Sequence, residues 1–171
     1  MIRKIIYGVY AILGMMTMAA CSGQSDASEI SLEKMHGFPT ENTGFLKGVS
    51  ALYAGVIDGN LLIAGGCNFP DTPAADGGKK VFYPDVYITS LSNDTAFEWK
   101  KIGQLPQAAA YGVTISTEKG LICVGGATAT HSLSDVFLLS LQKDVLKKDT
   151  LPSLPATIDN MAGALVGHSL Y

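Results

Sequence analysis

The sequence has few charged side chains and no excess of basic ones. Asp, Glu, Lys and Arg make up 16% of its 171 residues, and 15 acidic residues stand against 12 basic ones. A nucleic-acid partner requires a basic surface along the phosphate backbone, so the composition argues against such a partner. The low charge and the 19 glycines also argue against disorder and favour a compact chain with many turns.

Cysteine and histidine are sparse as well, with three of each. The histidines, His36, His131 and His168, share no spacing with one another or with cysteine, so we expect no metal site. The clustered Tyr and His ligands that a copper oxidase needs are missing too. Cys67 and Cys123 each stand beside a Gly-Gly pair in an apolar strand pattern, which favours buried free thiols. The alternative is a disulfide between them in an oxidising compartment.

The first twenty residues have the pattern of an export signal. Arg3 and Lys4 precede an uncharged, mostly apolar stretch at 5–20, which is shorter than a comfortable membrane span. Small residues then stand directly before Cys21. This order resembles the lipobox of bacterial lipoproteins, and the resemblance implies cleavage before Cys21 and lipid on its thiol. The alternative is an ordinary secretory signal with an incidental cysteine. We expect an exported protein in the periplasm or outer membrane, attached to the membrane only by its lipid.

After the predicted signal at 1–20, residues 21–47 show little periodicity and are interpreted as a tether. From residue 48 onward the chain repeats itself. Three landmarks occur twice in the same order: an apolar strand ending in Gly-Gly, an Asp that opens a strand, and a Leu-Pro. They lie at 61–66 and 121–126, at 85–88 and 135–138, and at 105–106 and 154–155. The glycine pairs are 60 residues apart and the aspartates 50, so the first unit has about ten extra residues between its landmarks.

This pattern resembles the kelch repeat, in which Trp99 would belong to an outer strand. We therefore expect an all-β, kelch-type β-propeller at 48–171, with units at 48–107 and 108–156 and an incomplete third at 157–171. Each blade has four short antiparallel strands and two apolar faces that neighbouring blades must cover. The Gly pair allows a tight backbone path in which a Cβ would clash. An open β-sandwich with similar turn spacing is the alternative.

A narrower resemblance rests on five short motifs. They are GVS at 48–50, YAG at 53–55, AGGCNFP at 64–70, GGKK at 77–80 and AYGV at 110–113. Together they resemble the cyclically permuted mutarotase family, kelch propellers similar to bacterial N-acetylneuraminate epimerase. The resemblance implies six blades, and the first two units here resemble the last two of the unpermuted epimerase. Since about two and a half blades are present, we expect a protein roughly twice as long.

The family resemblance implies an enzyme that equilibrates the α and β anomers of sialic acid in the periplasm. Mutarotation moves a proton between the anomeric hydroxyl and the ring oxygen, so an acid and a base suffice and no cofactor is required. In the family a Glu and an Arg after a Gly pair are implicated in catalysis. Their blade corresponds to chain beyond Tyr171, so we expect the present chain to be inactive. The alternative functions are a non-catalytic kelch lipoprotein that binds glycans or a protein partner, and an inactive remnant of either.

The long loop after the first Gly-Gly supplies most candidate substrate-binding residues, because loops at one end of a propeller usually form the site. The candidates are Asn68, Phe69, Asp76, Lys79, Lys80 and, at the start of the next unit, Tyr111. Either lysine suits the carboxylate of the sugar, and Asn68 suits a sugar hydroxyl. The alternatives are a solvated turn at 76–80 and a core position for Tyr111. Ala109 departs from the family pattern, since the epimerase has Arg before its Ala-Tyr-Gly.

Overall fold

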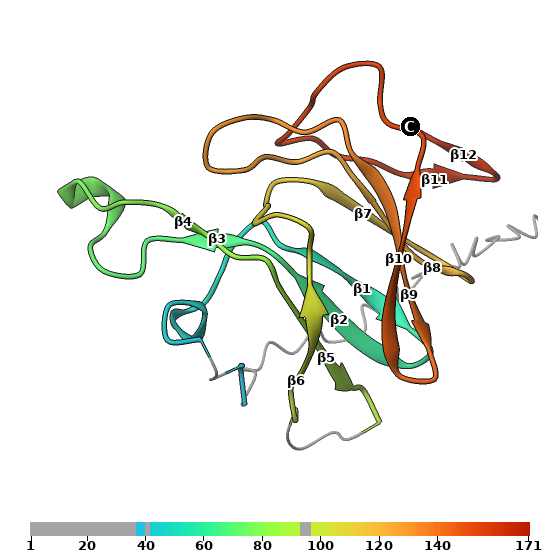
Figure 1. Cartoon of the computed structure of the whole chain (residues 1–171), viewed down its shortest axis with the longest axis horizontal. Coiled ribbons are helices and arrows are strands. Elements are labelled where there is room, and N and C mark those ends of the chain that lie inside the picture. Colours follow the sequence, from blue (N-terminus) through green and yellow to red (C-terminus); the bar gives the residue numbers. More distant parts are fainter. Residues whose placement is uncertain (1–36, 40–41, 93–96) are drawn as a thin grey trace, which may run out of the picture. The chain divides into compact units, whose positions relative to one another are not determined.

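The computed structural model describes residues 37–39, 42–92 and 97–171, and its elements are nearly all β-strands (Figure 1). The predicted signal peptide at 1–20, the predicted lipidation site Cys21 and the first part of the predicted tether lie outside the described residues. In the part of the chain that is described, no helix is long and apolar enough to cross a membrane.

The first unit is a four-stranded antiparallel sheet. Its strands, in the order in which they pair, are β1 (Tyr53–Ile57), β2 (Asn60–Ala64), β5 (Asp85–Ser90) and β6 (Lys100–Gln104). A two-residue turn joins β1 to β2, and its residues Asp58 and Gly59 have φ values of +49° and +74°. Two successive positive φ angles are typical of a type I′ turn, whose twist matches that of the flanking strands.

The second unit is a sheet with the same order of pairing. Its strands are β7 (Val113–Thr117), β8 (Gly120–Val124), β9 (Val136–Gln142) and β10 (Val145–Leu151). The turn between β9 and β10 again has two positive φ angles, at Lys143 and Asp144. Both sheets follow the up-and-down path of a propeller blade. The prediction of an all-β, kelch-type propeller with two complete blades is confirmed.

Smaller elements complete the described chain. They are the 3-10 helices η1 (Phe45–Lys47) and η2 (Ala74–Asp76), and the strand pairs β3 (Cys67–Asn68) with β4 (Val81–Phe82) and β11 (Leu165–Val166) with β12 (Ser169–Leu170). The β3–β4 hairpin belongs to the first unit. The β11–β12 hairpin lies in the segment expected to begin a third unit, and its residues are exposed.

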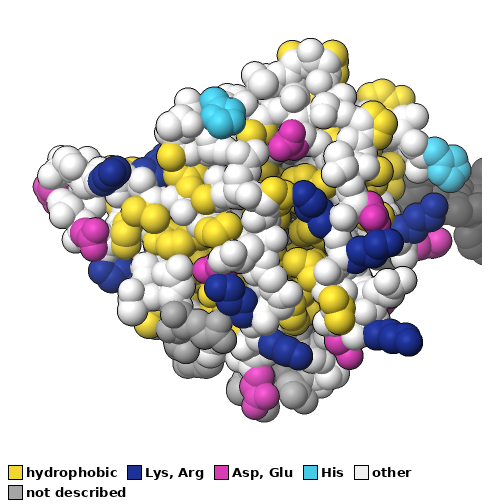
Figure 2. Space-filling view, in the orientation of Figure 1, with side chains coloured by type: hydrophobic (Ala, Val, Ile, Leu, Met, Phe, Trp, Pro, Cys, Tyr) yellow, Lys and Arg dark blue, Asp and Glu magenta, His cyan; other side chains and the backbone are white. Residues whose placement is uncertain are grey.

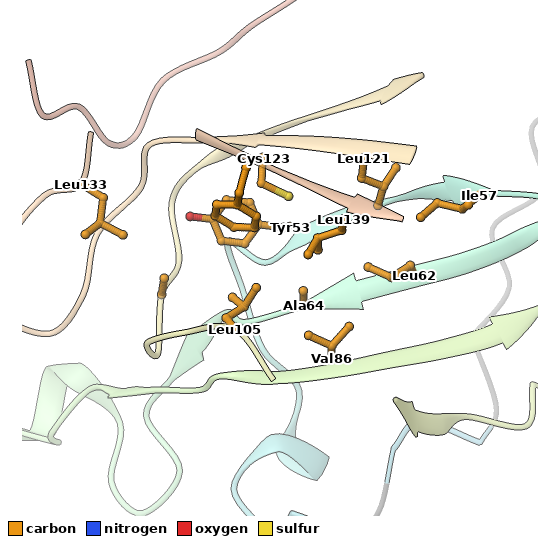
Figure 3. Packing of buried hydrophobic residues seen from close by; sticks show 12 residues of the cluster. Tyr53, Ile57, Leu62, Ala64, Val86, Leu105, Leu121, Cys123, Leu133 and Leu139 are labelled. Carbon is orange, nitrogen blue, oxygen red and sulfur yellow. The ribbon is translucent and has the colours of Figure 1, made fainter. Parts of the chain in front are cut away.

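The two sheets pack against each other, and the larger buried cluster fills the space between them (Figure 3). Its members with 1% exposure or less include Leu62 and Val86 from the first sheet and Leu121 and Leu139 from the second. Burying one such side chain contributes about 1.5–3 kcal/mol, so this contact is a main source of cohesion between the units. Tyr53 bridges them: its hydroxyl donates a 2.6 Å hydrogen bond to the Gly125 carbonyl, and burial raises the pKa of Tyr53.

A second cluster covers the other face of the first sheet and includes chain that we expected to be tether. Phe45 is fully buried, with its ring centroid 5.5 Å from that of Tyr83 and 5.0 Å from that of Tyr87. Phe38 stacks on Phe45 at 5.4 Å, and Trp99, directly before the outer strand β6, packs against the same cluster. The folded region therefore begins earlier than the predicted boundary, because these rings bury apolar surface on the sheet.

Each Gly-Gly pair lies where one unit meets the next. The Gly66 N–H donates a 2.8 Å hydrogen bond to the Ala109 carbonyl, and the Gly126 N–H donates one of 2.9 Å to the Ile158 carbonyl. A Cβ on Gly65, whose φ is +66°, would lie 2.3 Å from the oxygen of Ala109. The prediction of a backbone path that a Cβ would block is confirmed.

Cys67 and Cys123 are free and buried, as predicted. Cys123 belongs to the cluster between the sheets, and burial raises the pKa of its thiol to about 12. A thiol with that pKa stays protonated at neutral pH and is therefore a poor nucleophile. Cys123 acts in packing.

Candidate functional site

The two units differ most in the loop that follows each Gly-Gly pair. In the first unit the Tyr83 N–H donates a 3.0 Å hydrogen bond to the Gly66 carbonyl, and in the second the Leu133 N–H donates one of 2.7 Å to the Gly126 carbonyl. The same bond therefore closes both loops, and the loop of the first unit is ten residues longer. The extra residues form the β3–β4 hairpin and η2, which confirms the predicted insertion.

One position at the start of each unit is joined to its counterpart in the next unit. Ala51, Tyr111 and Asn160 occupy this position, with φ angles of +56°, +64° and +52°. The Tyr111 N–H donates a 2.8 Å hydrogen bond to the Ala51 carbonyl, and the Asn160 N–H donates one of 3.0 Å to the Tyr111 carbonyl. Ala51 and Tyr111 each lie two residues before the first residue of a strand, β1 and β7 respectively, and these two strands contact each other. The hydrogen bond to Ala51 holds Tyr111 next to the first unit.

Three of the predicted site residues come together where the β3–β4 hairpin meets the second unit. The Lys80 ammonium donates a 2.7 Å hydrogen bond to the Tyr111 hydroxyl. Its nitrogen lies 5.0 Å from the centroid of that ring and 5.5 Å from the centroid of Phe69. The hydrogen bond with Tyr111 raises the pKa of Lys80 and outweighs the opposing effect of desolvation. Lys80 is therefore charged at neutral pH, and the aromatic faces stabilise that charge.

The Lys80–Tyr111 pair has unused hydrogen-bonding capacity. The Tyr111 hydroxyl accepts from Lys80, so its own O–H is left to donate. Phe82, which the sequence did not indicate, packs edge-on against Tyr111 with 6.2 Å between ring centroids. Hydrophobic side chains gather over the β3–β4 hairpin with Lys or Arg beside them (Figure 2). The arrangement offers one fixed cation, one hydroxyl donor and aromatic walls.

Asn68 has a different environment from the one predicted. Its amide nitrogen donates hydrogen bonds of 2.7 and 2.6 Å to the carbonyls of Gly44 and Gly48. Its amide oxygen accepts a 2.8 Å hydrogen bond from the Tyr83 hydroxyl. Both amide protons are engaged, so neither is left for a sugar hydroxyl. Asn68 holds the η1 segment against the base of the hairpin.

Asp76 and Lys79 do not interact with the Lys80–Tyr111 pair. Asp76 is in η2, and both side chains are exposed. The 3-10 helix η2 ends at Gly77, whose φ is +81°. Within the described ranges, neither side chain makes a hydrogen bond or an ion pair, which agrees with the alternative of a solvated turn for these two residues. Across all the residues that the structure describes, no group of three or more His, Cys, Asp or Glu side chains is placed to hold a metal ion.

The fold places this chain among the kelch-type β-propellers. The family model of N-acetylneuraminate epimerase matches residues 7–147. The chain belongs to the N-acetylneuraminate epimerase family.

Individual relatives agree with this assignment. N-acetylneuraminate epimerase 1 of Escherichia coli O6:H1 is 30% identical over 149 residues, which are 81% of this chain and 39% of that protein. The epimerase of Brucella suis is 37% identical over 98 residues, 54% of this chain and 25% of that protein. The solved structure of YjhT superposes with a TM-score of 0.52 and 27% identity, over 60% of this chain and 31% of that one. The chain thus spans 39% or less of the length of these proteins.

Proposed function

We propose that this chain binds N-acetylneuraminate or a related acidic sugar, as part of a mutarotase that interconverts the α and β anomers of that sugar. The hydrogen-bonded pair of Lys80 and Tyr111 carries the proposal. A fixed ammonium beside a hydroxyl with a free proton suits a sugar carboxylate. Membership of the N-acetylneuraminate epimerase family supports the choice of sugar.

Mutarotation needs proton transfers and no other reagent. A base removes the proton of the anomeric hydroxyl while an acid protonates the ring oxygen. The bond between the ring oxygen and the anomeric carbon breaks, and the open-chain keto sugar forms. Rotation about the adjacent carbon–carbon bond and reclosure, with the protons returned, give the other anomer. The sugar keeps its composition and oxidation state, so the reaction requires no cofactor.

Lys80 and Tyr111 suit binding of the sugar better than removal of its proton. Because its pKa is raised, Lys80 stays protonated, so it can pair with a carboxylate but cannot act as the base. Tyr111 can donate a second hydrogen bond to the same carboxylate, and Phe69 offers an apolar wall for the sugar ring. In the described part of the chain no carboxylate bonds to either residue. We infer that these 171 residues bind the sugar and do not accelerate anomer exchange on their own.

Calorimetric titration of the purified protein with N-acetylneuraminate tests the binding. We expect Lys80→Met to weaken binding by about tenfold or more, because a charge-assisted hydrogen bond is lost. Lys79→Met is the matched control, since Lys79 is exposed and makes no ion pair, and it should leave the affinity unchanged. Equal affinity for N-acetylneuraminate and for a neutral hexose, with no effect of Lys80→Met, would reject the acidic-sugar assignment.

Proton NMR of a sample enriched in the α anomer tests the catalytic part separately. We expect this chain to leave the rate of anomer exchange at its spontaneous value while the sugar binds. Acceleration by the chain alone would contradict the inference that it only binds. Binding without acceleration by any longer form of the protein would favour the alternative of a non-catalytic glycan-binding kelch lipoprotein.

We also propose that the protein is exported and is anchored to the periplasmic side of a membrane by lipid on Cys21. The basic pair, the apolar stretch and the small residues before Cys21 support this. Cys21→Ser should release the protein from the membrane fraction and remove the mass of the lipid from the mature chain. Unchanged membrane association of Cys21→Ser would overturn the anchor, and an uncleaved cytoplasmic product from the unaltered gene would overturn export.

A further inference from the structure

A recess of about 340 Å³ lies between the loops that follow the two Gly-Gly pairs. Both units contribute to it. Its lining is formed by Phe82 of the first unit, by Gln107 and Ala108 at the junction, and by Thr128, Ala129, Thr130 and His131 of the second unit. These residues could not be singled out from the sequence, because they lie in three separate segments.

The recess adjoins the Lys80–Tyr111 pair. Phe82 connects them, because it lines the recess and its ring centroid lies 6.2 Å from that of Tyr111. A second connection is through the backbone: Ala110 and Ala127 exchange two hydrogen bonds, of 2.9 and 2.7 Å. Tyr111 directly follows one of these residues and Thr128 directly follows the other. The cation and the recess are therefore neighbouring parts of one surface.

The chemistry of the recess differs from that of the pair beside it. Its lining, as far as the described residues form it, contains no Lys, Arg, Asp or Glu. It combines one aromatic ring with hydroxyl, carboxamide and imidazole groups. Few polar groups around an apolar wall are typical of a site for a small neutral molecule or part of one. A hydroxylated carbon chain has C–H groups for the Phe82 ring and hydroxyls for the polar side chains.

His131 is fixed in orientation. Its Nδ1 lies 3.1 Å from the Thr128 hydroxyl and 3.0 Å from the Thr130 hydroxyl. A hydroxyl that donates to Nδ1 leaves the imidazole proton on Nε2. Among the residues that the structure describes, none bonds to that second nitrogen. Gln107 gives a 3.3 Å hydrogen bond to Asp135 through its amide nitrogen, which leaves its amide oxygen as an acceptor.

We propose that this recess is a second subsite, which binds the neutral polyhydroxyl side chain of the acidic sugar whose carboxylate pairs with Lys80. The proposal rests on the proposed function, because it places the carboxylate of the same molecule at the Lys80–Tyr111 pair. Phe82 lines the recess and packs against Tyr111 with 6.2 Å between ring centroids, so a sugar held at the Lys80–Tyr111 pair lies next to the recess that would take its side chain. His131 donates to a side-chain hydroxyl, Gln107 accepts from one, and Phe82 contacts the carbon chain.

A comparison of two ligands tests the subsite. One is N-acetylneuraminate, which has a three-carbon polyol side chain. The other is its derivative shortened to one side-chain carbon, made by periodate cleavage and borohydride reduction of the methyl glycoside, whose anomeric carbon is protected, followed by acid hydrolysis to the free sugar. We expect the unaltered protein to bind the shortened sugar about tenfold more weakly, since hydrogen bonds to two hydroxyls are lost. His131→Ala should weaken binding of the intact sugar severalfold and leave the shortened sugar unaffected. His168→Ala is the control, because His168 is also exposed and lies in the turn of the β11–β12 hairpin, and it should change neither affinity.

The outcomes separate the subsite from the function on which it rests. Lys80→Met should weaken binding of both ligands by the same factor, because both keep the carboxylate. If Lys80→Met has this effect but shortening the side chain and His131→Ala do not, the proposed function stands and the subsite is wrong. If neither ligand binds the unaltered protein, the proposed function fails first. Equal loss of both ligands in His131→Ala, with an unchanged thermal midpoint, would also overturn the subsite, since it would place His131 at the carboxylate.

Discussion

The two units have the same backbone hydrogen bonds at equivalent positions but different side-chain environments, most clearly at Asp85 and Asp135. The carbonyls of both residues accept a hydrogen bond from the first glycine of the Gly-Gly pair in their own unit, at 3.0 and 2.8 Å. Asp85 is 3% exposed, and its carboxylate accepts from Lys101 at 2.8 Å, Gln104 at 2.9 Å and Asn42 at 3.3 Å.

Asp135 has no such environment. It is exposed, and its carboxylate accepts a hydrogen bond from Gln107 at 3.3 Å. The repeated Asp therefore marks a common backbone position, while the role of its side chain depends on the neighbours of each unit. In the first unit the segment before η1 supplies Asn42 and helps to bury Asp85. A feature that belongs to the repeat should respond alike in both units, and a feature that depends on neighbours should not.

The largest loss of stability should come from replacing the first glycine of a Gly-Gly pair, and it should be similar in the two units. A Cβ would lie 2.3 Å from the Ala109 oxygen at Gly65 and 2.5 Å from the Ile158 oxygen at Gly125, and both φ angles are positive. The clash is with backbone, which cannot rotate away, so Gly65→Ala and Gly125→Ala should each lower the free energy of unfolding by about 3 kcal/mol or more. Urea denaturation measures this.

Gly59→Ala is the control for those two variants. Its φ is also positive, at +74°, but a Cβ there would meet nothing within 4 Å. The loss should be about 1 kcal/mol, the cost of the backbone conformation alone. A loss at Gly65 or Gly125 no larger than at Gly59 would show that contact between the units contributes little to the need for glycine.

The next largest loss of stability, from replacing the repeated Asp, should differ between the units. Asp85→Asn places an amide where three donors converge, so hydrogen bonds and a charge interaction are lost in a buried position. We expect a loss of about 2 kcal/mol. Asp135→Asn should cost less than about 0.5 kcal/mol, as is usual for exposed sites. Equal losses in thermal or urea unfolding would mean that the Asp side chain has a common role in the repeat.

The repeat itself could be predicted from the sequence because its signals are local. Two adjacent glycines, a strand opened by Asp and a Leu-Pro can each be recognised within a short window. The ten-residue insertion then follows from the different spacing of these landmarks between the two units, 60 residues for the glycine pairs and 50 for the aspartates. The β1–β2 turn lies just before the first of these glycine pairs, and its two positive-φ residues are Asp58 and Gly59. The buried thiols followed from their place in apolar strands next to the glycines.

The contacts that define the candidate site could not be predicted in full, because they join segments far apart in the sequence. Lys80 and Tyr111 were candidates, but their hydrogen bond spans 31 residues. Asn68 looked like a loop residue free to bind a ligand, and only the fold brings it to the carbonyls before and after η1. The η1 segment lacks periodicity, so nothing in it indicated that Phe45 would be buried.

The smallest expected effect is the change with pH in how much the Asp85 carboxylate stabilises the folded state. Burial by itself would raise the pKa of Asp85, but hydrogen bonds from Lys101, Gln104 and Asn42 outweigh burial and hold the pKa below its usual range. A group whose pKa is lower in the folded state stabilises that state above its unfolded pKa, which is about 3.9 for Asp. This stabilisation is lost as the pH falls through the folded pKa.

We therefore expect the stability difference between the unaltered protein and Asp85→Asn to be constant from neutral pH to about pH 5 and to shrink below about pH 4. The comparison cancels the titration of all other carboxylates, because both proteins contain them. Urea midpoints measured from pH 7 to pH 3 provide the test, with Asp135→Asn, at the exposed counterpart in the second unit, as the matched variant. A difference for Asp85→Asn that grows as the pH falls would mean that burial outweighs the hydrogen bonds, and that Asp85 lies in the core at a net cost.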